Sequence, residues 1–118
     1  MALKKSNNVV PIRDYNGDMH IVSLPPLLNF TAKHPDARQA VLAWRDEVKK
    51  ARWRQPVDIK AQYASVSILK NRRVVFNLKG NEYRMIVAVA YQVGFVYVKF
   101  IGTHVEYDAV DADTVEQF

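Results

Sequence analysis

The stretch RRVVFNLKGNEYRMIVAVAYQVGFVYVKFI, residues 72–101, decides the fold of this chain. Apolar and polar side chains alternate along three runs within it, and two short glycine-containing segments, at 80–81 and 92–94, separate the runs. Alternation with a period of two is typical of strands, and tight turns join neighbouring strands in antiparallel order. The stretch therefore predicts a three-stranded antiparallel meander.

One face of this meander is predicted to be the core face. Its members are the apolar residues at alternate positions of each strand: Val74, Phe76, Leu78, Met85, Val87, Val89, Val96, Val98 and Phe100. The opposite face carries cations on all three strands, with an amide, an aromatic ring and small apolar residues: Arg73, Val75, Asn77, Lys79, Arg84, Ile86, Ala88, Tyr97 and Lys99. A solvated face would also be polar, but only Glu82 supplies a carboxylate there. A concave basic face of this kind suits a phosphate backbone.

Helical patterns precede the meander. Prolines 25 and 26 are tolerated in the first turn of a helix that runs to about Lys33, and Asp36 is a suitable N-cap for the next. In that second helix, apolar residues recur at spacings of four and three: Ala37, Val41, Trp44, Val48 and Ala51. We therefore expect a helical hairpin over 24–51, followed by a short helix near 55–63.

The run that begins at Met19 adds one strand before the hairpin. The expected fold class is thus α+β, with an N-terminal strand, a helical hairpin and a short helix packed on an antiparallel meander. Residues 1–18 are polar and rich in structure-breaking residues. We expect them to be an extension of a single domain at 19–118, with Met19 as a candidate second start. The alternative is a small hairpin turned by Asn16-Gly17.

Composition excludes several classes of protein. A chain of 118 residues, 49 % hydrophobic, is sufficient for one modest core. It contains no cysteine, so disulfides, thiolate metal sites and cysteine nucleophiles are excluded. It has neither an 18-residue apolar run nor a signal-peptide pattern. We therefore expect a cytoplasmic protein without a membrane partner.

Charge is divided between two regions of the chain. The net charge is +5, but residues 101–118 contain five acids and no Lys or Arg, so the preceding residues carry +10. An anionic partner such as nucleic acid fits this basic part. We expect residues 102–108 to form the rim of the basic face, and residues 111–118 to be a solvated tail.

His104 is the candidate for proton transfer. It follows the last predicted strand, and an imidazole there can exchange a proton near neutral pH. Tyr107 lies three residues on, which places it on the same side of a helical turn. No metal-ligand spacing occurs among the histidines, so neither a metal nor another cofactor is predicted. Together with Arg73, Arg84 and Lys99, these residues suit metal-free RNA cleavage, in which cations stabilise the charged phosphorane. The alternative is that His104 only caps or packs at the strand end.

Three segments give the chain its resemblance to a known family: HPDARQAVLAWRDEVKKARWRQPVDIKA, SILKNRRVVFNLKGNEYRMIVAVAY and VYVKFIGTHVEYDAVDA. With the strand at Met19 they cover about residues 19–113, and the pattern resembles the HigB group of the RelE/ParE toxin superfamily. The resemblance implies a ribosome-dependent mRNA endonuclease without a metal, which blocks translation. It also implies a cognate helix-turn-helix antitoxin of the HigA type, in a hetero-oligomeric complex with the toxin.

The same resemblance assigns candidate site residues. The arginine of the GNxYR motif falls on Arg84, a candidate for phosphate stabilisation, and the GTHxEYD motif places His104 and Tyr107 as candidate acid or base. Asn77 occupies the motif's FN position. Arg73 and Lys99 come from the alternation along the strands and not from the resemblance; with Asn77 and Lys79 they are the candidate RNA contacts on the basic face.

Two other functions remain open from the sequence. The ParE-like branch of the superfamily inhibits gyrase by binding and not by RNA cleavage. A non-catalytic RNA- or protein-binding domain would also use a basic surface. A titrating pair beside an arginine favours the nuclease, because a binder has no need of one.

Overall fold

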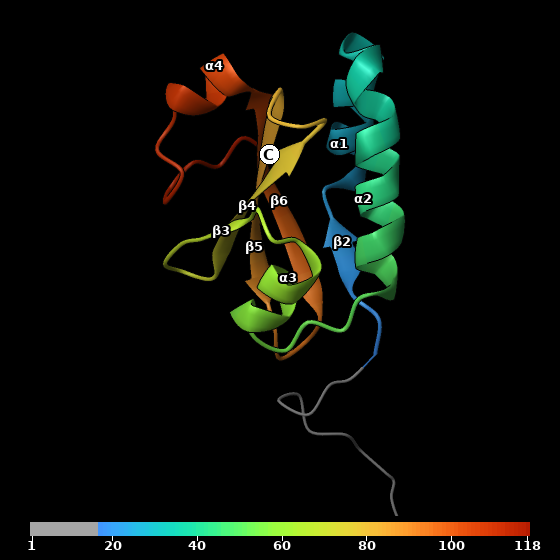
Figure 1. Cartoon of the computed structure of the whole chain (residues 1–118), viewed down its shortest axis with the longest axis vertical. Coiled ribbons are helices and arrows are strands. Elements are labelled where there is room, and N and C mark those ends of the chain that lie inside the picture. The colour runs from blue at the N-terminus through green and yellow to red at the C-terminus, as the bar shows by residue number, and fades with distance from the viewer. Residues whose placement is uncertain (1–16) are drawn as a thin grey trace, which may run out of the picture.

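The computed structural model describes residues 17–118, and the predictions that concern residues 1–16 lie outside that range. The elements are β2 (His20–Val22), α1 (Leu24–Lys33), η2 (Pro35–Ala37), α2 (Arg38–Lys50), α3 (Pro56–Gln62), β3 (Ser67–Ile68), β4 (Arg73–Leu78), β5 (Tyr83–Ala90), β6 (Phe95–Thr103) and α4 (His104–Asp108). This arrangement confirms the predicted α+β class (Figure 1). No helix in this part of the chain is long and apolar enough to cross a membrane.

A five-stranded sheet organises the molecule, in the order β2-β6-β5-β4-β3. The predicted meander is its centre, since β4, β5 and β6 pair in antiparallel order. The N-terminal strand β2 pairs in parallel with β6, with His20 opposite Phe95. At the other edge, the two-residue strand β3 pairs with β4. Its shortness explains why the alternation pattern did not predict it.

The turn between β4 and β5 depends on backbone conformations that few residues adopt. Lys79 (φ 50°) and Gly80 (φ 66°) are both in the left-handed region. Glycine reaches this region without the steric cost that a Cβ brings. The turn returns the chain so that Asn77 and Arg84 become direct cross-strand partners.

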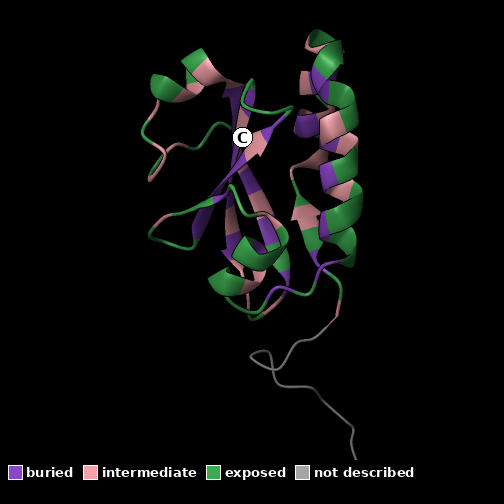
Figure 2. Cartoon of the chain, in the orientation of Figure 1, coloured by how far each residue is buried: buried purple, intermediate pink, exposed green. Residues whose placement is uncertain are grey.

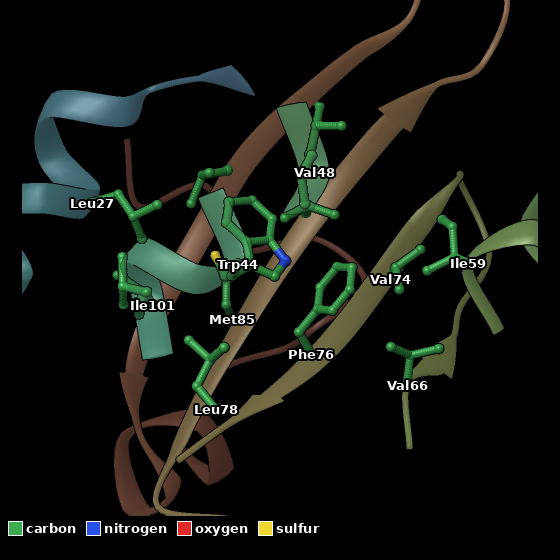
Figure 3. Close-up of a cluster of buried hydrophobic side chains, with 14 of the residues drawn as sticks. Leu27, Trp44, Val48, Ile59, Val66, Val74, Phe76, Leu78, Met85 and Ile101 are labelled. Atoms are coloured by element: carbon green, nitrogen blue, oxygen red, sulfur yellow. The ribbon is translucent and has the colours of Figure 1, made fainter. Parts of the chain in front are cut away.

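The inner face of the sheet, which the helices cover, carries the main core (Figures 2 and 3). Phe76 is at its centre, with ring centroids 5.6 Å from Trp44, 6.1 Å from Trp53 and 5.1 Å from Tyr63. The two tryptophans come from α2 and from the segment that follows it. Aromatic contacts of this kind bury large apolar areas, so they fix the helices onto the sheet.

A β-bulge changes the predicted face of one strand. Val98 pairs with Val87 and Phe100 pairs with Ile86, which leaves Lys99 between them as an extra residue. An extra residue reverses the alternation beyond it. Phe100, predicted for the inner core, therefore lies on the outer face, and Ile101 takes the inner position.

The outer face of the sheet is covered as well, which the sequence did not predict. Val75, Ile86 and Phe100 form a second apolar cluster there. Side chains from the following segments pack against this cluster: Leu69, Tyr107, Val110, Ala112 and Val115. The prediction of a solvated tail at residues 111–118 is wrong, because apolar side chains of this segment and the backbone of Gln117 contact the sheet. We call residues 111–118 the C-terminal strap.

Asp36 differs from its predicted role as an N-cap. It lies in η2, and no side-chain capping bond is found at the start of η2 or α2. Its carboxylate accepts hydrogen bonds from the Tyr83 hydroxyl at 2.6 Å and from the Lys79 ammonium at 2.9 Å. The residue therefore ties the helical layer to the β4–β5 turn.

Candidate active site

The candidate site lies where β5 begins and β6 ends. The register places Arg84 opposite Gly102 and Tyr83 opposite Thr103. The helix α4 starts directly after this last pair. A reciprocal capping box fixes its first turn, because the Thr103 amide donates to the Glu106 carboxylate at 2.8 Å and the Glu106 amide donates to the Thr103 hydroxyl at 3.1 Å. The local sequence thus directs α4 back over the strand that carries Arg84.

Gly102 makes this close return possible. A Cβ at this position would lie 2.7 Å from the Phe100 ring and 2.9 Å from a Glu106 oxygen. Both distances are shorter than real Cβ contacts. A side chain here would force the Phe100 ring and the Glu106 carboxylate to move, and that carboxylate caps the start of α4.

Arg84 and Tyr107 form the core of the site. The Arg84 guanidinium carbon lies 5.0 Å from the centroid of the Tyr107 ring, within the range of a cation–π contact. The side-chain oxygen of Asn81 accepts from Arg84 Nε at 3.2 Å and from Nη2 at 2.7 Å. Among residues 17–118 no ion pair of Arg84 with a carboxylate is found. Its positive charge therefore stays available to a phosphate.

His104 lies one turn earlier on α4, and its partner is a carboxylate. Its Nδ1 lies 3.1 Å from Asp108 Oδ2, an i,i+4 contact along the helix. The backbone amide of His104 donates to the Glu82 carbonyl at 3.1 Å, which anchors this end of the helix to the β4–β5 turn. A carboxylate on Nδ1 orients the ring and leaves Nε2 to exchange a proton.

The structure therefore brings some of the predicted residues together and separates others. Arg84 faces Tyr107, whereas His104 at the same end of the sheet is paired with Asp108. Asn81 and Asp108 are the orienting residues that the sequence analysis did not assign. The four-residue spacing between His104 and Asp108 was the signal for one of them. For Asn81, the sequence showed only that it lies in the β4–β5 turn, which does not predict a contact with Arg84.

Asn77 and Lys79, two of the predicted RNA contacts, lie beside this site. Asn77 is the cross-strand partner of Arg84, and its amide donates to the Ser65 carbonyl at 3.3 Å. Lys79 contacts Asp36 and Glu82, at 2.9 Å and 3.3 Å. The hydrogen bonds from Tyr83 and Lys79 lower the pKa of Asp36, and the two carboxylates raise the pKa of Lys79. The charge of Lys79 is thus largely compensated, and its contact with RNA stays a prediction.

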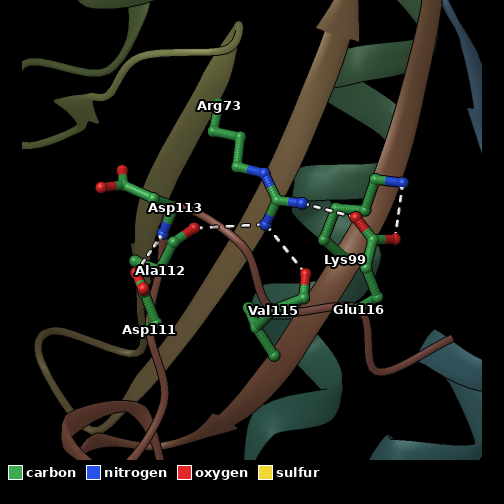
Figure 4. Close-up of polar contacts among 7 residues, drawn as sticks. All are labelled: Arg73, Lys99, Asp111, Ala112, Asp113, Val115 and Glu116. Carbon is green, nitrogen blue, oxygen red and sulfur yellow. Dashed lines mark hydrogen bonds and ion pairs between the residues drawn. The ribbon is translucent and has the colours of Figure 1, made fainter.

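Arg73 and Lys99, the other two predicted contacts, are engaged by the C-terminal strap (Figure 4). Arg73 is only 6 % exposed. Its Nη1 donates to the carbonyls of Ala112 and Val115, at 3.2 Å and 2.8 Å. Its Nη2 and the Lys99 ammonium contact opposite oxygens of Glu116, at 2.6 Å and 2.9 Å. Neither cation is open to RNA while the strap lies in this position, and their role as RNA contacts stays a prediction.

Comparison with known proteins places these residues in a family context. Residues 37–110 match the family described as HigB toxin, the RelE-like toxic component of a toxin-antitoxin system. The chain is 28 % identical over 92 residues to the mRNA interferase toxin HigB of Escherichia coli strain K12, which covers 76 % of this chain and 88 % of that protein. Identity and coverage are the same for the mRNA interferase HigB of Shigella flexneri. The family match includes Arg84, His104 and Tyr107.

Proposed function

This chain belongs to the HigB family of RelE-like toxins, and we propose that it is an endoribonuclease that cuts mRNA on the ribosome. The names of its relatives support the enzyme class, since both are called mRNA interferases. As the toxic component of a toxin-antitoxin system, it has an antitoxin as its partner. We propose that this partner is of the HigA type, that it binds the toxin in a hetero-oligomeric complex, and that the toxin acts in the cytoplasm.

The proposed reaction is an attack within the RNA itself. A base on the protein removes the proton of a 2′-hydroxyl, and the oxygen attacks the adjacent phosphorus. The bond from phosphorus to the 5′-oxygen breaks, and an acid protonates that oxygen. The products are a 2′,3′-cyclic phosphate and a 5′-hydroxyl end. No protein group is consumed, and the proton that leaves the 2′-oxygen balances the one that the leaving oxygen gains.

Each residue of the site has a proposed role in this reaction. His104 and Tyr107 share the roles of base and acid. The Arg84 guanidinium stabilises the extra negative charge that develops on the phosphorane oxygens. Asp108 orients the imidazole, and Asn81 orients the guanidinium. The proposal depends above all on the environment of Arg84. Within residues 17–118 its guanidinium forms no ion pair with a carboxylate, and it lies over the Tyr107 ring, one helical turn from the His104 imidazole.

Mapping the 5′ ends of cellular mRNA after the protein is induced without an antitoxin tests this function. We expect growth arrest with new 5′ ends inside translated reading frames. Intact mRNA together with DNA damage would instead favour the gyrase-inhibiting branch. Intact mRNA and undamaged DNA would favour a binding domain without catalysis.

Substitution of Arg84 tests whether the candidate active site causes the growth arrest. We expect Arg84→Ala to relieve the growth arrest, while Arg38→Ala, which removes an exposed arginine from α2, leaves it unchanged. Circular dichroism of both purified variants checks that they are folded. Full toxicity of a folded Arg84→Ala variant would contradict the assignment.

A further inference from the structure

The C-terminal strap, residues 111–118, crosses the outer face of the sheet beside the candidate active site (Figures 1 and 4). It carries three carboxylates and no Lys or Arg: Asp111, Asp113 and Glu116. Its Val115 and Ala112 pack on the same apolar cluster that Tyr107 contacts. The strap and the active site therefore share one continuous surface, with Tyr107 at the border between them.

Glu116 is bound as a small anion would be. One carboxylate oxygen accepts from Arg73 Nη2 at 2.6 Å and the other lies 2.9 Å from the Lys99 ammonium. Both hydrogen bonds are charge-assisted, and a guanidinium and an ammonium favour carboxylates and phosphates for the same reason. A phosphodiester has one negative charge and two non-bridging oxygens. It can therefore take the place of this carboxylate with both hydrogen bonds kept.

The bulge in β6 gives the strap its second attachment. Lys99 has no partner residue in β5. Its carbonyl instead accepts from the Gln117 amide at 2.9 Å. The Gln117 side-chain oxygen in turn accepts from the Ile101 amide at 2.8 Å. The strap is thus attached by a short set of contacts with the rim of the sheet, and no regular strand pairing holds it.

The two cations lie within reach of an RNA strand whose scissile phosphate is at Arg84. Arg73 lies opposite Ala88 on β5, four residues along the strand from Arg84. At about 3.3 Å per residue, this places the Arg73 end of the face roughly 13 Å from the Arg84 end. An RNA backbone with its scissile phosphate at Arg84 can therefore reach the Arg73–Lys99 pair by crossing the apolar cluster where the strap now lies.

We propose that the C-terminal strap is a built-in competitor of RNA: Glu116 occupies a phosphate-binding position between Arg73 and Lys99, and RNA must displace the strap to bind across the sheet. This inference rests on the proposed RNA-cleaving function. Displacement leaves neither cation without an anion, because Glu116 is half exposed and an RNA phosphate would replace its carboxylate as the partner of the buried Arg73 guanidinium. It also accounts for the acidic end of a basic chain, because the carboxylates compensate the face that binds RNA.

Hydrogen exchange at the Gln117 amide tests the displacement in the unmodified protein. The probe is a short single-stranded 2′-O-methyl RNA, which has no free 2′-hydroxyl and cannot be cleaved by the proposed reaction. We expect this amide to exchange at least roughly fivefold faster when the RNA is bound, since its bond to Lys99 is then broken. RNA that binds without faster exchange would overturn the strap inference alone. Absence of RNA binding would overturn it too.

Two charge-matched variants measure the competition itself. Glu116→Gln and Asp113→Asn each remove one negative charge from the strap, but within residues 17–118 the Asp113 carboxylate pairs with the exposed Lys70, at 3.7 Å, and with neither Arg73 nor Lys99. We expect Glu116→Gln to bind the RNA roughly two- to tenfold more tightly than Asp113→Asn, because the competing carboxylate is lost. Equal affinity of the two folded variants would overturn the inference. The mRNA mapping described above reports on the proposed function separately, since it does not depend on how the strap behaves.

Discussion

The two faces of the sheet are closed in different ways. The helices close the inner face, and its contacts are among large apolar side chains such as Phe76 and Trp44. On the outer face, three apolar residues lie among arginines and lysines, under a short helix and the strap. The inner face forms the main core. The outer face places cations beside its apolar cluster, with Arg73 and Lys99 under the strap and Arg84 beside Tyr107.

The difference also concerns how firmly each cover is attached. Two helices and a third short helix are anchored to the inner face by fully buried residues. The strap on the outer face is attached by Glu116, Gln117 and a few small apolar side chains. Segments with few buried apolar contacts open at low free energy. Changes to the inner face should therefore affect stability, and changes to the outer face should affect activity or the strap.

The largest expected effect on stability comes from Phe76→Ala. Phe76 is fully buried in contact with three other aromatic rings, so its truncation leaves a cavity in the main core. We expect the free energy of unfolding to fall by about 3–5 kcal/mol, measured by urea denaturation. A loss below about 1 kcal/mol would show that the inner face is not the structural centre of the molecule.

His104→Ala, at the end of the outer face, should lower activity strongly and stability very little. We expect the rate of mRNA cleavage in programmed ribosomes to fall by about 10²–10⁴-fold, the usual contribution of a general acid or base. The free energy of unfolding should change by less than about 0.5 kcal/mol, because His104 is partly exposed and lies outside both apolar clusters. Comparable losses of stability and activity would mean that His104 only packs at the strand end.

A pair of conservative substitutions compares the two faces directly. Ile86→Val on the outer face and Ile59→Val on the inner side each remove one methylene group from a fully buried side chain. Each should lower the free energy of unfolding by about 0.5–1.5 kcal/mol in urea denaturation. Only Ile86→Val should also speed hydrogen exchange at Gln117, because Val115 packs on its cluster. Equal effects on that amide would show that the strap and the main core unfold as one unit.

The smallest expected effect is a pH dependence of the strap. The Lys99 ammonium and the adjacent Arg73 lower the pKa of Glu116 from its ordinary value of 4.5. The ionised carboxylate therefore stabilises the docked strap fully above pH 4.5, and this contribution is lost as pH falls through the lowered pKa. In NMR spectra, we expect the Gln117 amide signal to move at acidic pH before the core signals change. Glu116→Gln should remove this separate transition.

The sequence predicted the inner face well for a physical reason. Every second position of β4 and β5 is apolar, as are the positions three and four residues apart in α2, and these positions point to the helix–sheet interface, so they locate the main core directly. In β6 the prediction failed after the bulge at Lys99. A single extra residue reverses which face the following side chains occupy, and no residue type in the sequence indicates a bulge there. Phe100 was therefore predicted for the inner face.

The sequence did not predict that the C-terminal strap covers the outer face, and the reason is different. The C-terminal strap has no regular periodicity, and its acids resemble those of a solvated segment. Its docking depends on Arg73 and on the carbonyl that the bulge leaves free, and both are tertiary features. For the site, the strand-end position of His104 and the resemblance located the candidate residues. The partners that orient them, Asn81 and Asp108, required the turn and the helix to be placed in space.

We propose that the end of the outer face at Arg84 and His104 cleaves RNA by attack of the RNA's own 2′-hydroxyl. The most direct test uses ribosomes programmed with an mRNA that carries one 2′-deoxy nucleotide at the mapped cleavage position. We expect cleavage at this position to disappear, while the all-ribose message is cut to a 2′,3′-cyclic phosphate and a 5′-hydroxyl end. Cleavage of the 2′-deoxy message at the same position would contradict it.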